Sequence, residues 1–199
     1  MKPVIPILLL ASIIYGQFQT SDAKYRGFSK IDCLGLIIYG IDDDDLFDEI
    51  VGRIKKDDET VPYLKNGYYY YSRYEEKKEY AFYCRKKGSL DAEEEIMLDG
   101  NELADGHDYF AVGGMSVSPD NNWLAYGIDT LSRRFYTIYF KNLSTGNILE
   151  QVVPNTTGNI AWANDNKTVF YSSKNKITLL SEKIYRHKIG SDPVKDILV

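Results

Sequence analysis

The chain has few of the side chains that build metal centres and disulfide frameworks. Its 199 residues include two cysteines and two histidines. Cys33 and Cys84 lie in unlike contexts without Cys-x-x-Cys spacing, and His107 and His187 have no second ligand at metal-binding spacing. The sequence therefore predicts two free thiols, two structural histidines and no metal site.

Motifs of catalysis are missing as well. The sequence has no glycine loop that would cradle a phosphate and no His-Glu-x-x-His pattern. The stretch GMSVS at 114–118 comes nearest to the Gly-x-Ser-x-Gly turn of a hydrolase nucleophile, but it lacks the second glycine and leads into a Pro-Asp turn, so Ser116 is not predicted to be a nucleophile. The acidic run Asp42–Asp45 lacks the spacing of a calcium loop. We predict no catalytic, cofactor-binding or metal-binding residue and no cofactor.

Positive charge is also scarce, since the net charge is −5 and the pI is near 5.1. This balance argues against a nucleic-acid partner. The apolar run from Val4 to Tyr15 is too short to span a membrane as a helix. Two interpretations of residues 1–16 stay open: a signal peptide, which would imply a periplasmic or secreted protein, or a buried part of the fold in a cytoplasmic one. Residues 17–45 are predicted to be irregular.

A short amphipathic helix is predicted at residues 46–58. Apolar residues recur there on one helical face, Asp45 has the character of an N-cap, and lysines lie at the other end. From Val61 onward there is almost no helical periodicity, and the high content of aromatic residues, 14%, favours strands.

A repeat of 45 residues organises the rest of the chain. "MSVSPDNNWLAYGID" (Met115–Asp129) is echoed by "NIAWANDNKTVFYSS" (Asn159–Ser173), so that Asp120 aligns with Asp165 and Tyr126 with Tyr171. "FYTIYFKNLSTG" (135–146) is echoed by "EKIYRHKIGSD" (182–192), with Tyr139 on Tyr185, and a looser copy occupies residues 66–88. Strand, polar turn and strand at a period of about 40 to 45 residues are typical of β-propeller blades.

The predicted fold is mainly β: an incomplete β-propeller at residues 61–199, preceded by the helix. The repeats amount to about two and a half to three blades, which cannot close a ring. We therefore expect the outer face of the last blade to stay open. Gly113 and Gly114 predict a bend or a close approach of two backbones, and Trp123 and Trp162 are expected to shape the blades. A single antiparallel sandwich is the alternative.

The sequence resembles the amino-terminal propeller of the oligopeptidase B-like members of the prolyl oligopeptidase family of serine peptidases. The resemblance covers roughly Leu46 to Val199 and rests on four motifs: "EIVGRIK", "VPY", "GYYYYSRYEEKKEY" and "VSPDNNWLAYGIDT". Residues 17–45 do not match the Tyr- and Trp-rich segment with which the family begins.

The resemblance implies a seven-bladed propeller that covers an α/β-hydrolase domain with a Ser, Asp and His triad. The complete enzyme would cut short peptides after Lys or Arg, with these peptides as partners and no membrane span. All triad residues lie in a carboxy-terminal portion that this sequence lacks, so the chain is expected to be inactive alone. The alternative function is a free-standing secreted β-propeller binding module.

Overall fold

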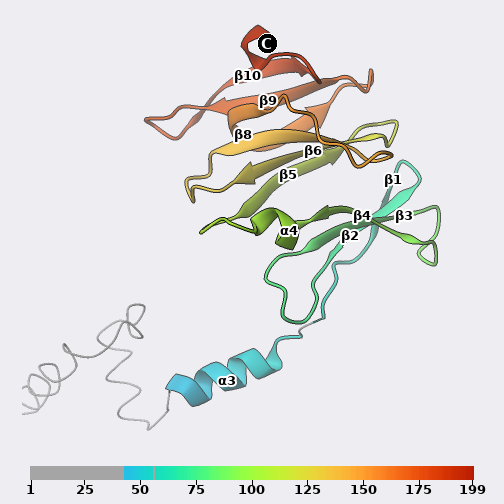
Figure 1. Cartoon of the computed structure of the whole chain (residues 1–199), viewed down its shortest axis with the longest axis vertical. Helices are drawn as coiled ribbons and strands as arrows, with labels where there is room; N and C mark the ends of the chain where they lie inside the picture. Colours follow the sequence, from blue (N-terminus) through green and yellow to red (C-terminus); the bar gives the residue numbers. More distant parts are fainter. Residues whose placement is uncertain (1–42, 56) are drawn as a thin grey trace, which may run out of the picture. The chain divides into compact units, whose positions relative to one another are not determined.

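The computed structural model describes residues 43–55 and 57–199, which belong to two units divided after Lys55. The signal-peptide interpretation of residues 1–16 and most of the irregular segment predicted at residues 17–45 lie outside the described residues. In the described part of the chain, the first unit contains one helix and the second contains all the strands (Figure 1).

The helix of the first unit, α3, spans Asp43–Arg53, whereas the sequence predicts residues 46–58. The prediction that Asp45 is the N-cap is wrong, because Asp45 lies inside the first turn. Acidic side chains in a first turn complement the positive end of the helix dipole, which favours a start before the predicted one. At the other end the helix stops at Arg53, ahead of Lys55.

The second unit begins with a sheet of four antiparallel strands in chain order, the first blade. Its strands are β1 (Tyr63–Lys65), β2 (Tyr68–Arg73), β3 (Phe82–Lys87) and β4 (Glu94–Asp99). Asn66 and Gly67 join β1 to β2, and both have positive φ, as a tight hairpin turn requires. The short helix α4 (Gly100–Ala104) follows, capped by the Asp99 side chain, which accepts hydrogen bonds from the N–H groups of Asn101 and Glu102. Its five residues are too few to produce a helical period in the sequence.

The remaining strands form one sheet in the order β11-β10-β9-β8-β7-β6-β5. Their bounds are β5 (Ala111–Val117), β6 (Trp123–Asp129), β7 (Tyr136–Asn142), β8 (Val153–Trp162), β9 (Thr168–Lys174), β10 (Ser181–Lys188) and β11 (Ile197–Leu198), with the 3-10 helix η2 (Pro193–Lys195) before β11. Strand β8 is ten residues long. It pairs with β7 near Val153 and with β9 near Ile160, so it links a second blade (β5–β7 and the start of β8) to a third (the end of β8 and β9–β11).

The repeat predicted from the sequence is confirmed strand by strand. In the second blade Met115 pairs with Tyr126, and Tyr126 pairs with Tyr139. In the third blade Ile160 pairs with Tyr171, which pairs with Tyr185. The rings stack in the same way, since the centroids of Tyr126 and Tyr139 lie 5.6 Å apart and those of Tyr171 and Tyr185 lie 5.7 Å apart. The blades are therefore copies of one unit at the level of side-chain packing.

The turns of the two blades repeat as well. Asp120 accepts a hydrogen bond from one backbone N–H of its own turn, and Asp165 accepts two. The next residues, Asn121 and Asn166, have φ of 63° and 58°. Asparagine tolerates this left-handed conformation better than most residues. The Asn166 side-chain oxygen also accepts a hydrogen bond of 2.9 Å from the Asp120 N–H, which joins one turn to the next.

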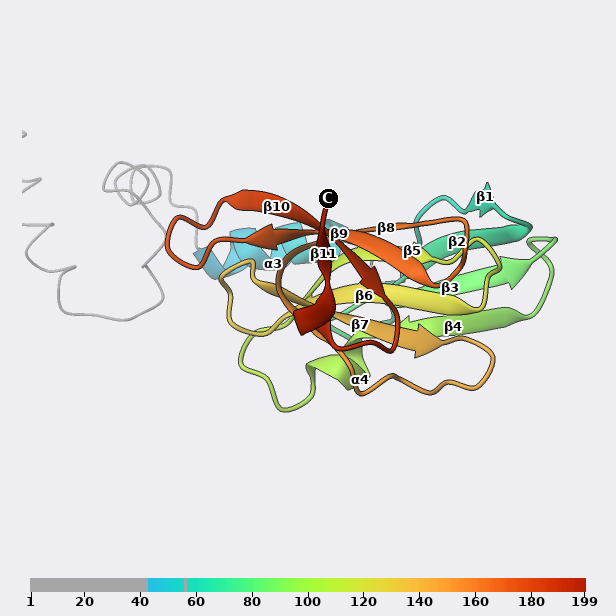
Figure 2. The ribbon, with the colours of Figure 1, turned by 90° about the horizontal axis from the view of Figure 1, so that it is seen from above.

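Buried side chains lie between successive blades. One cluster joins the first blade to the second, and its members are Tyr70, Met97, Leu98, Leu124 and Tyr126. A second joins the second blade to the third, and its members are Ala125, Ile138, Phe140, Val153, Val169 and Tyr171. Seen from above, the strands of the third blade overlie those of the second (Figure 2). Stability therefore comes from blade-on-blade burial, as expected of a repeat protein.

The close approach predicted at Gly113 and Gly114 is confirmed where β5 meets β8. A Cβ atom on Gly114 would lie 2.4 Å from the Gly158 carbonyl oxygen, and one on Gly113 would lie 2.7 Å from the Tyr136 ring. Trp162 completes the junction by donating a hydrogen bond of 2.9 Å from its indole N–H to the Ser116 carbonyl. The inner strands of the second and third blades are thus held backbone to backbone.

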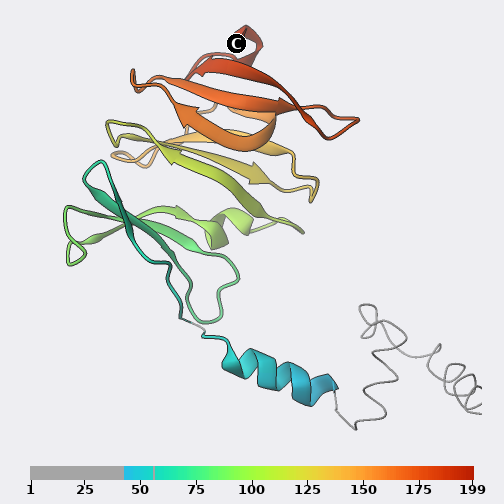
Figure 3. The ribbon, with the colours of Figure 1, turned by 180° about the vertical axis from the view of Figure 1, so that it is seen from behind.

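The third blade leaves apolar side chains exposed on and beside its last strands. Ile184 on β10 and Ile197 on β11 are both about half exposed, at 52% and 53%. These strands form the end of the sheet in the view from behind (Figure 3). The open last face agrees with the expectation for an array of blades that does not close a ring.

Candidate functional site

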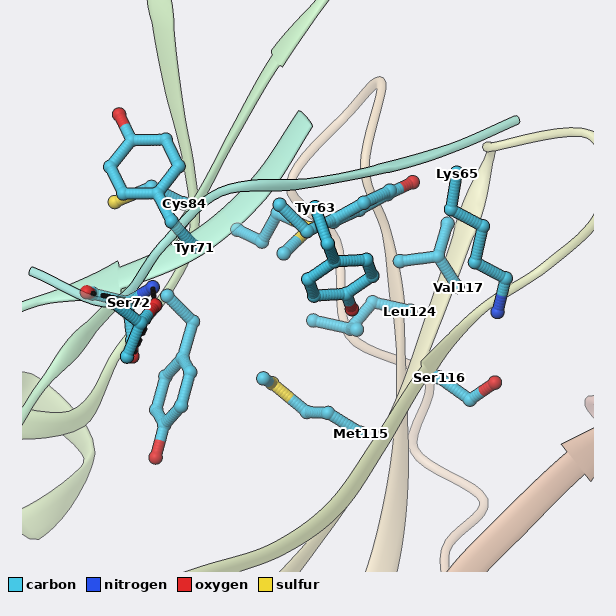
Figure 4. Close-up of a pocket in the computed structure, with 13 residues that line it drawn as sticks. Tyr63, Lys65, Tyr71, Ser72, Cys84, Met115, Ser116, Val117 and Leu124 are labelled. Atoms are coloured by element: carbon cyan, nitrogen blue, oxygen red, sulfur yellow. Dashed lines mark hydrogen bonds between the residues drawn. The ribbon is translucent and has the colours of Figure 1, made fainter. Parts of the chain in front are cut away.

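A hollow of about 210 Å³ lies between the first blade and strands β5 and β6. It is the candidate functional site of the second unit (Figure 4). The residues that line it are Thr60, Tyr63, Lys65, Tyr70, Tyr71, Ser72, Tyr83, Cys84, Met97, Met115, Ser116, Val117 and Leu124.

The hollow exists because this junction is built from large side chains. On the other side of β5, Gly114 and Gly158 bring two backbones together. Towards the first blade, β5 instead presents Met115 and Val117, which pack against the buried cluster around Tyr70. The Tyr63 ring of β1 stacks on Tyr70 with a centroid distance of 5.6 Å. Side chains therefore hold β1 away from β5, and a space remains between them.

The walls differ in polarity from one side of the hollow to the other. Tyr63, Met115 and Leu124 surround its middle, while Lys65 lies at one side (Figure 4). Within the described residues, Lys65 takes part in no ion pair. The site thus combines an aromatic and aliphatic interior with an ammonium group at its rim.

The thiol of Cys84, one of the lining residues, is not a nucleophile at neutral pH. Burial, and then the nearby Glu94 carboxylate, raise the pKa of Cys84 to about 12. Since the thiolate is the reactive form, this thiol remains protonated and inert. Cys84 is free, as predicted, and Cys33 lies outside the described residues.

Beside Cys84, an ion-pair network covers the outward face of the first blade. Arg73 donates hydrogen bonds to both Glu94 carboxylate oxygens, and the Tyr71 hydroxyl donates to the same carboxylate. The Arg73 guanidinium carbon also lies 4.6 Å from the centroid of the Phe82 ring. This network shields the small apolar cluster of Tyr71, Phe82 and Cys84 from solvent.

This network should make stability depend on pH through Glu94. The hydrogen bonds from Arg73, and then that from Tyr71, hold the pKa of Glu94 below its ordinary value despite the opposing effect of burial. A carboxylate with a lowered folded-state pKa stabilises the fold above its unfolded-state pKa, and this contribution is lost as the pH falls through the folded value. We expect Glu94→Gln to lower the free energy of unfolding at pH 7, and the difference from wild type to shrink below about pH 4.

Urea denaturation of both proteins at pH 7 and pH 3 measures this dependence. Glu150→Gln is the control, because Glu150 is exposed, and it should differ little from wild type at either pH. A Glu94→Gln difference that is the same at both pH values would contradict the assignment.

The residues that the sequence analysis considered as possible catalytic or metal-binding residues lie on different elements of the structure. Ser116 lies within β5, not at a strand-to-helix turn, and the Asp42–Asp45 run falls partly outside the described residues and partly in α3. His107 lies in the loop after α4. Among the described residues, no group of three or more His, Cys, Asp or Glu side chains is placed to hold a metal ion. In the same part of the chain, no helix has the length and apolar character needed to cross a membrane.

One buried polar network was not predicted from the sequence. His187 is fully buried, and its Nδ1 lies 2.7 Å from an oxygen of Asp196, whose other oxygen accepts a hydrogen bond of 2.9 Å from the Tyr171 hydroxyl. The His187 ring also stacks on Phe140. Burial, and then the bond to Asp196, raise the pKa of Tyr171, so its hydroxyl remains a donor at neutral pH. The network ties η2 and β11 to the third blade, and nothing in the spacing of these residues indicates it.

Three successive antiparallel meanders, packed face to face with a repeating register, define a portion of a β-propeller. Residues 41–199 match the domain described as prolyl oligopeptidase, N-terminal beta-propeller domain. The chain therefore belongs to the prolyl oligopeptidase family and corresponds to its amino-terminal propeller.

Curated relatives and solved structures agree with this assignment. The chain is 42% identical over 172 residues to dipeptidyl aminopeptidase BI of Pseudoxanthomonas mexicana, covering 79% of this chain and 24% of that protein. It is 33% identical over 161 residues to protease 2 of Moraxella lacunata, covering 77% and 23%. Oligopeptidase B from Leishmania major superposes with a TM-score of 0.73 at 31% identity, over 78% of this chain and 22% of that one. The chain thus spans about a quarter of the length of the curated relatives that it matches.

Proposed function

We propose that this chain supplies the first blades of the propeller of a serine oligopeptidase that hydrolyses short peptides after Lys or Arg. The observation that supports it most directly is the resemblance of the blades to oligopeptidase B from Leishmania major. In the proposed enzyme the propeller limits access, so that short peptides reach the catalytic domain and folded proteins do not.

We also propose that residues 1–199 do not hydrolyse peptides by themselves. Acyl transfer needs a nucleophile within hydrogen-bond reach of a base, and an oxyanion hole. In the described part of the chain, the ring of His187, on β10 of the third blade, is hydrogen-bonded to Asp196, whereas Ser116 lies within β5 of the second blade. Both features support an inactive chain.

Incubating purified residues 1–199 with an arginine ester tests this inactivity. We expect no turnover above a blank treated with a serine-directed inhibitor. Inhibitor-sensitive turnover would overturn the proposal.

A mass measurement on the same sample tests the alternative of a free-standing binding module, which predicts a stable closed oligomer with a cooperative melting transition.

Substrate preference is tested on the longer polypeptide. The coding sequence downstream of Val199 should encode a Gly-x-Ser-x-Gly motif, and the product that includes it should cleave blocked Arg and Lys amides in preference to blocked Ala amides.

The name of the relative from Pseudoxanthomonas mexicana supports a second candidate, removal of dipeptides. That activity would require a free amino group, so cleavage of an Xaa-Arg amide but not of its acetylated form would favour it.

A further inference from the structure

We infer that the hollow between the first and second blades is a binding site for a small apolar monocarboxylate, such as an arylalkanoic acid or the carboxy-terminal residue of a peptide. The inference rests on the geometry of the hollow. Binding of a peptide carboxy terminus also rests on the proposed function, whereas binding of a free acid does not.

The interior suits an aromatic or branched aliphatic group. Its walls are the Tyr63 ring and the side chains of Met97, Met115 and Leu124. Methionine side chains adapt to irregular shapes and make favourable contacts with aromatic rings, and an apolar group entering the hollow leaves water. Tyr70 offers no free donor to a competing polar ligand, because its hydroxyl donates to the Asn121 side-chain oxygen.

The rim selects a carboxylate. Lys65 lies at one side of the hollow and offers an ammonium group there, whereas the Ser116 side chain lies on the other side of β5 from Met115 and Val117 (Figure 4). Other polar groups of the lining are already engaged: Ser72 N–H donates to the Thr60 hydroxyl oxygen at 2.9 Å, and Thr60 N–H donates to the Ser72 carbonyl at 2.8 Å. An ammonium group without an ion-pair partner in the described structure favours an anion, and a charge-assisted hydrogen bond is the stronger kind.

The size limits the ligand. A cavity of about 150 Å³ is known to accept benzene, so the 210 Å³ here admits one ring and a short chain. Sites of this volume hold fragments, not drug-sized molecules. We therefore expect dissociation constants of about 1 mM for an acid of this size.

The methionines provide a direct readout. The chain has three, Met1, Met97 and Met115, and two of them line the hollow. We would label the full chain with ¹³C-methyl methionine and titrate it with 3-phenylpropionate. We expect saturable shifts of the Met97 and Met115 methyl signals, caused by the ring of the probe. Neutral 3-phenylpropionamide should bind at least about tenfold more weakly, because it lacks the charge.

Variants locate the site. Lys65→Met should weaken binding of the acid to the level of the amide, whereas Lys176→Met, in the β9–β10 loop, should bind the acid like wild type. Tyr63→Ala removes one wall and should weaken both probes. Unchanged melting temperatures would show that these variants remain folded; Tyr63 and Lys65 are both exposed on β1.

The outcomes separate the sources of the carboxylate. Binding of Gly-Gly-Phe but not of its amide would support a peptide carboxy terminus, while binding of 3-phenylpropionate alone would restrict the site to free acids. Equal binding of acid and amide, an unchanged affinity in Lys65→Met, or no shift of Met97 and Met115 at about 20 mM probe would overturn the inference. A failure of the proposed peptidase function leaves the free-acid result unaffected.

Discussion

Gly114→Ala is expected to destabilise the second unit by about 3 kcal/mol. The added Cβ would lie 2.4 Å from the Gly158 carbonyl oxygen and 3.1 Å from the Asn159 Cα. Both neighbours are backbone atoms, so no flexible side chain can move aside. Gly158 cannot retreat easily, because the Tyr136 ring already lies against it. The free energy of unfolding from urea denaturation, at an unchanged m-value, measures the loss.

Gly146→Ala is the matched control for this substitution. Gly146 has a φ of 77°, but a Cβ there would meet no atom within 4 Å. Its replacement should therefore cost only the strain of the left-handed backbone, about 1 to 2 kcal/mol. If Gly114→Ala cost less than Gly146→Ala, the backbones of β5 and β8 would not be in contact as described.

The second large effect is expected for Arg85→Met, which should cost about 2 to 4 kcal/mol. Arg85 is 4% exposed, and it donates two hydrogen bonds of 2.8 Å to Glu95 and one of 2.9 Å to the Asn121 carbonyl. Methionine keeps much of the apolar volume but leaves both acceptors without their donor. The Glu95 side chain is 38% exposed and can be hydrated, so the loss should fall short of that for a fully buried pair.

A double-mutant cycle with Glu95→Gln separates the ion pair from the contact between blades. We expect a coupling energy of about 1 to 3 kcal/mol between the two positions. Lys87→Met serves as the control, because Lys87 is exposed and its replacement should change stability by less than about 0.5 kcal/mol. A loss for Arg85→Met as small as that for Lys87→Met would mean that Arg85 does not hold the first blade against the second.

The proposed function and the proposed ligand depend on different parts of the molecule. The first depends on the family of the propeller and on residues beyond those of this chain. The second depends on Lys65, Tyr63 and the methionines of one junction. The two can therefore succeed or fail separately, and the experiments above distinguish them.

Much of the fold could be predicted because its signals are local. The turns around Asp120 and Asp165 need residues that tolerate left-handed backbone, and the strands on either side carry aromatic residues at matched positions. Each of these requirements acts over a few neighbouring residues and recurs after 45, so the blade and its period are visible in the sequence. The prediction of Asp45 as the N-cap of α3 is wrong because local signals are ambiguous there: within a run of four aspartates, several positions offer a similar cap.

The sequence alone determined the class of fold, the repeat and its equivalent tyrosines, the free Cys84 thiol, and a bend or close approach at Gly113 and Gly114. Only the tertiary structure decided which elements meet, and it brought together Gly114 with Gly158, Arg85 with Asn121, His187 with Asp196, and the walls of the hollow. Most of these contacts join residues of different strands or blades. Because the packing of blade on blade, and not any local pattern, sets the distance between them, they become visible only when the blades are stacked.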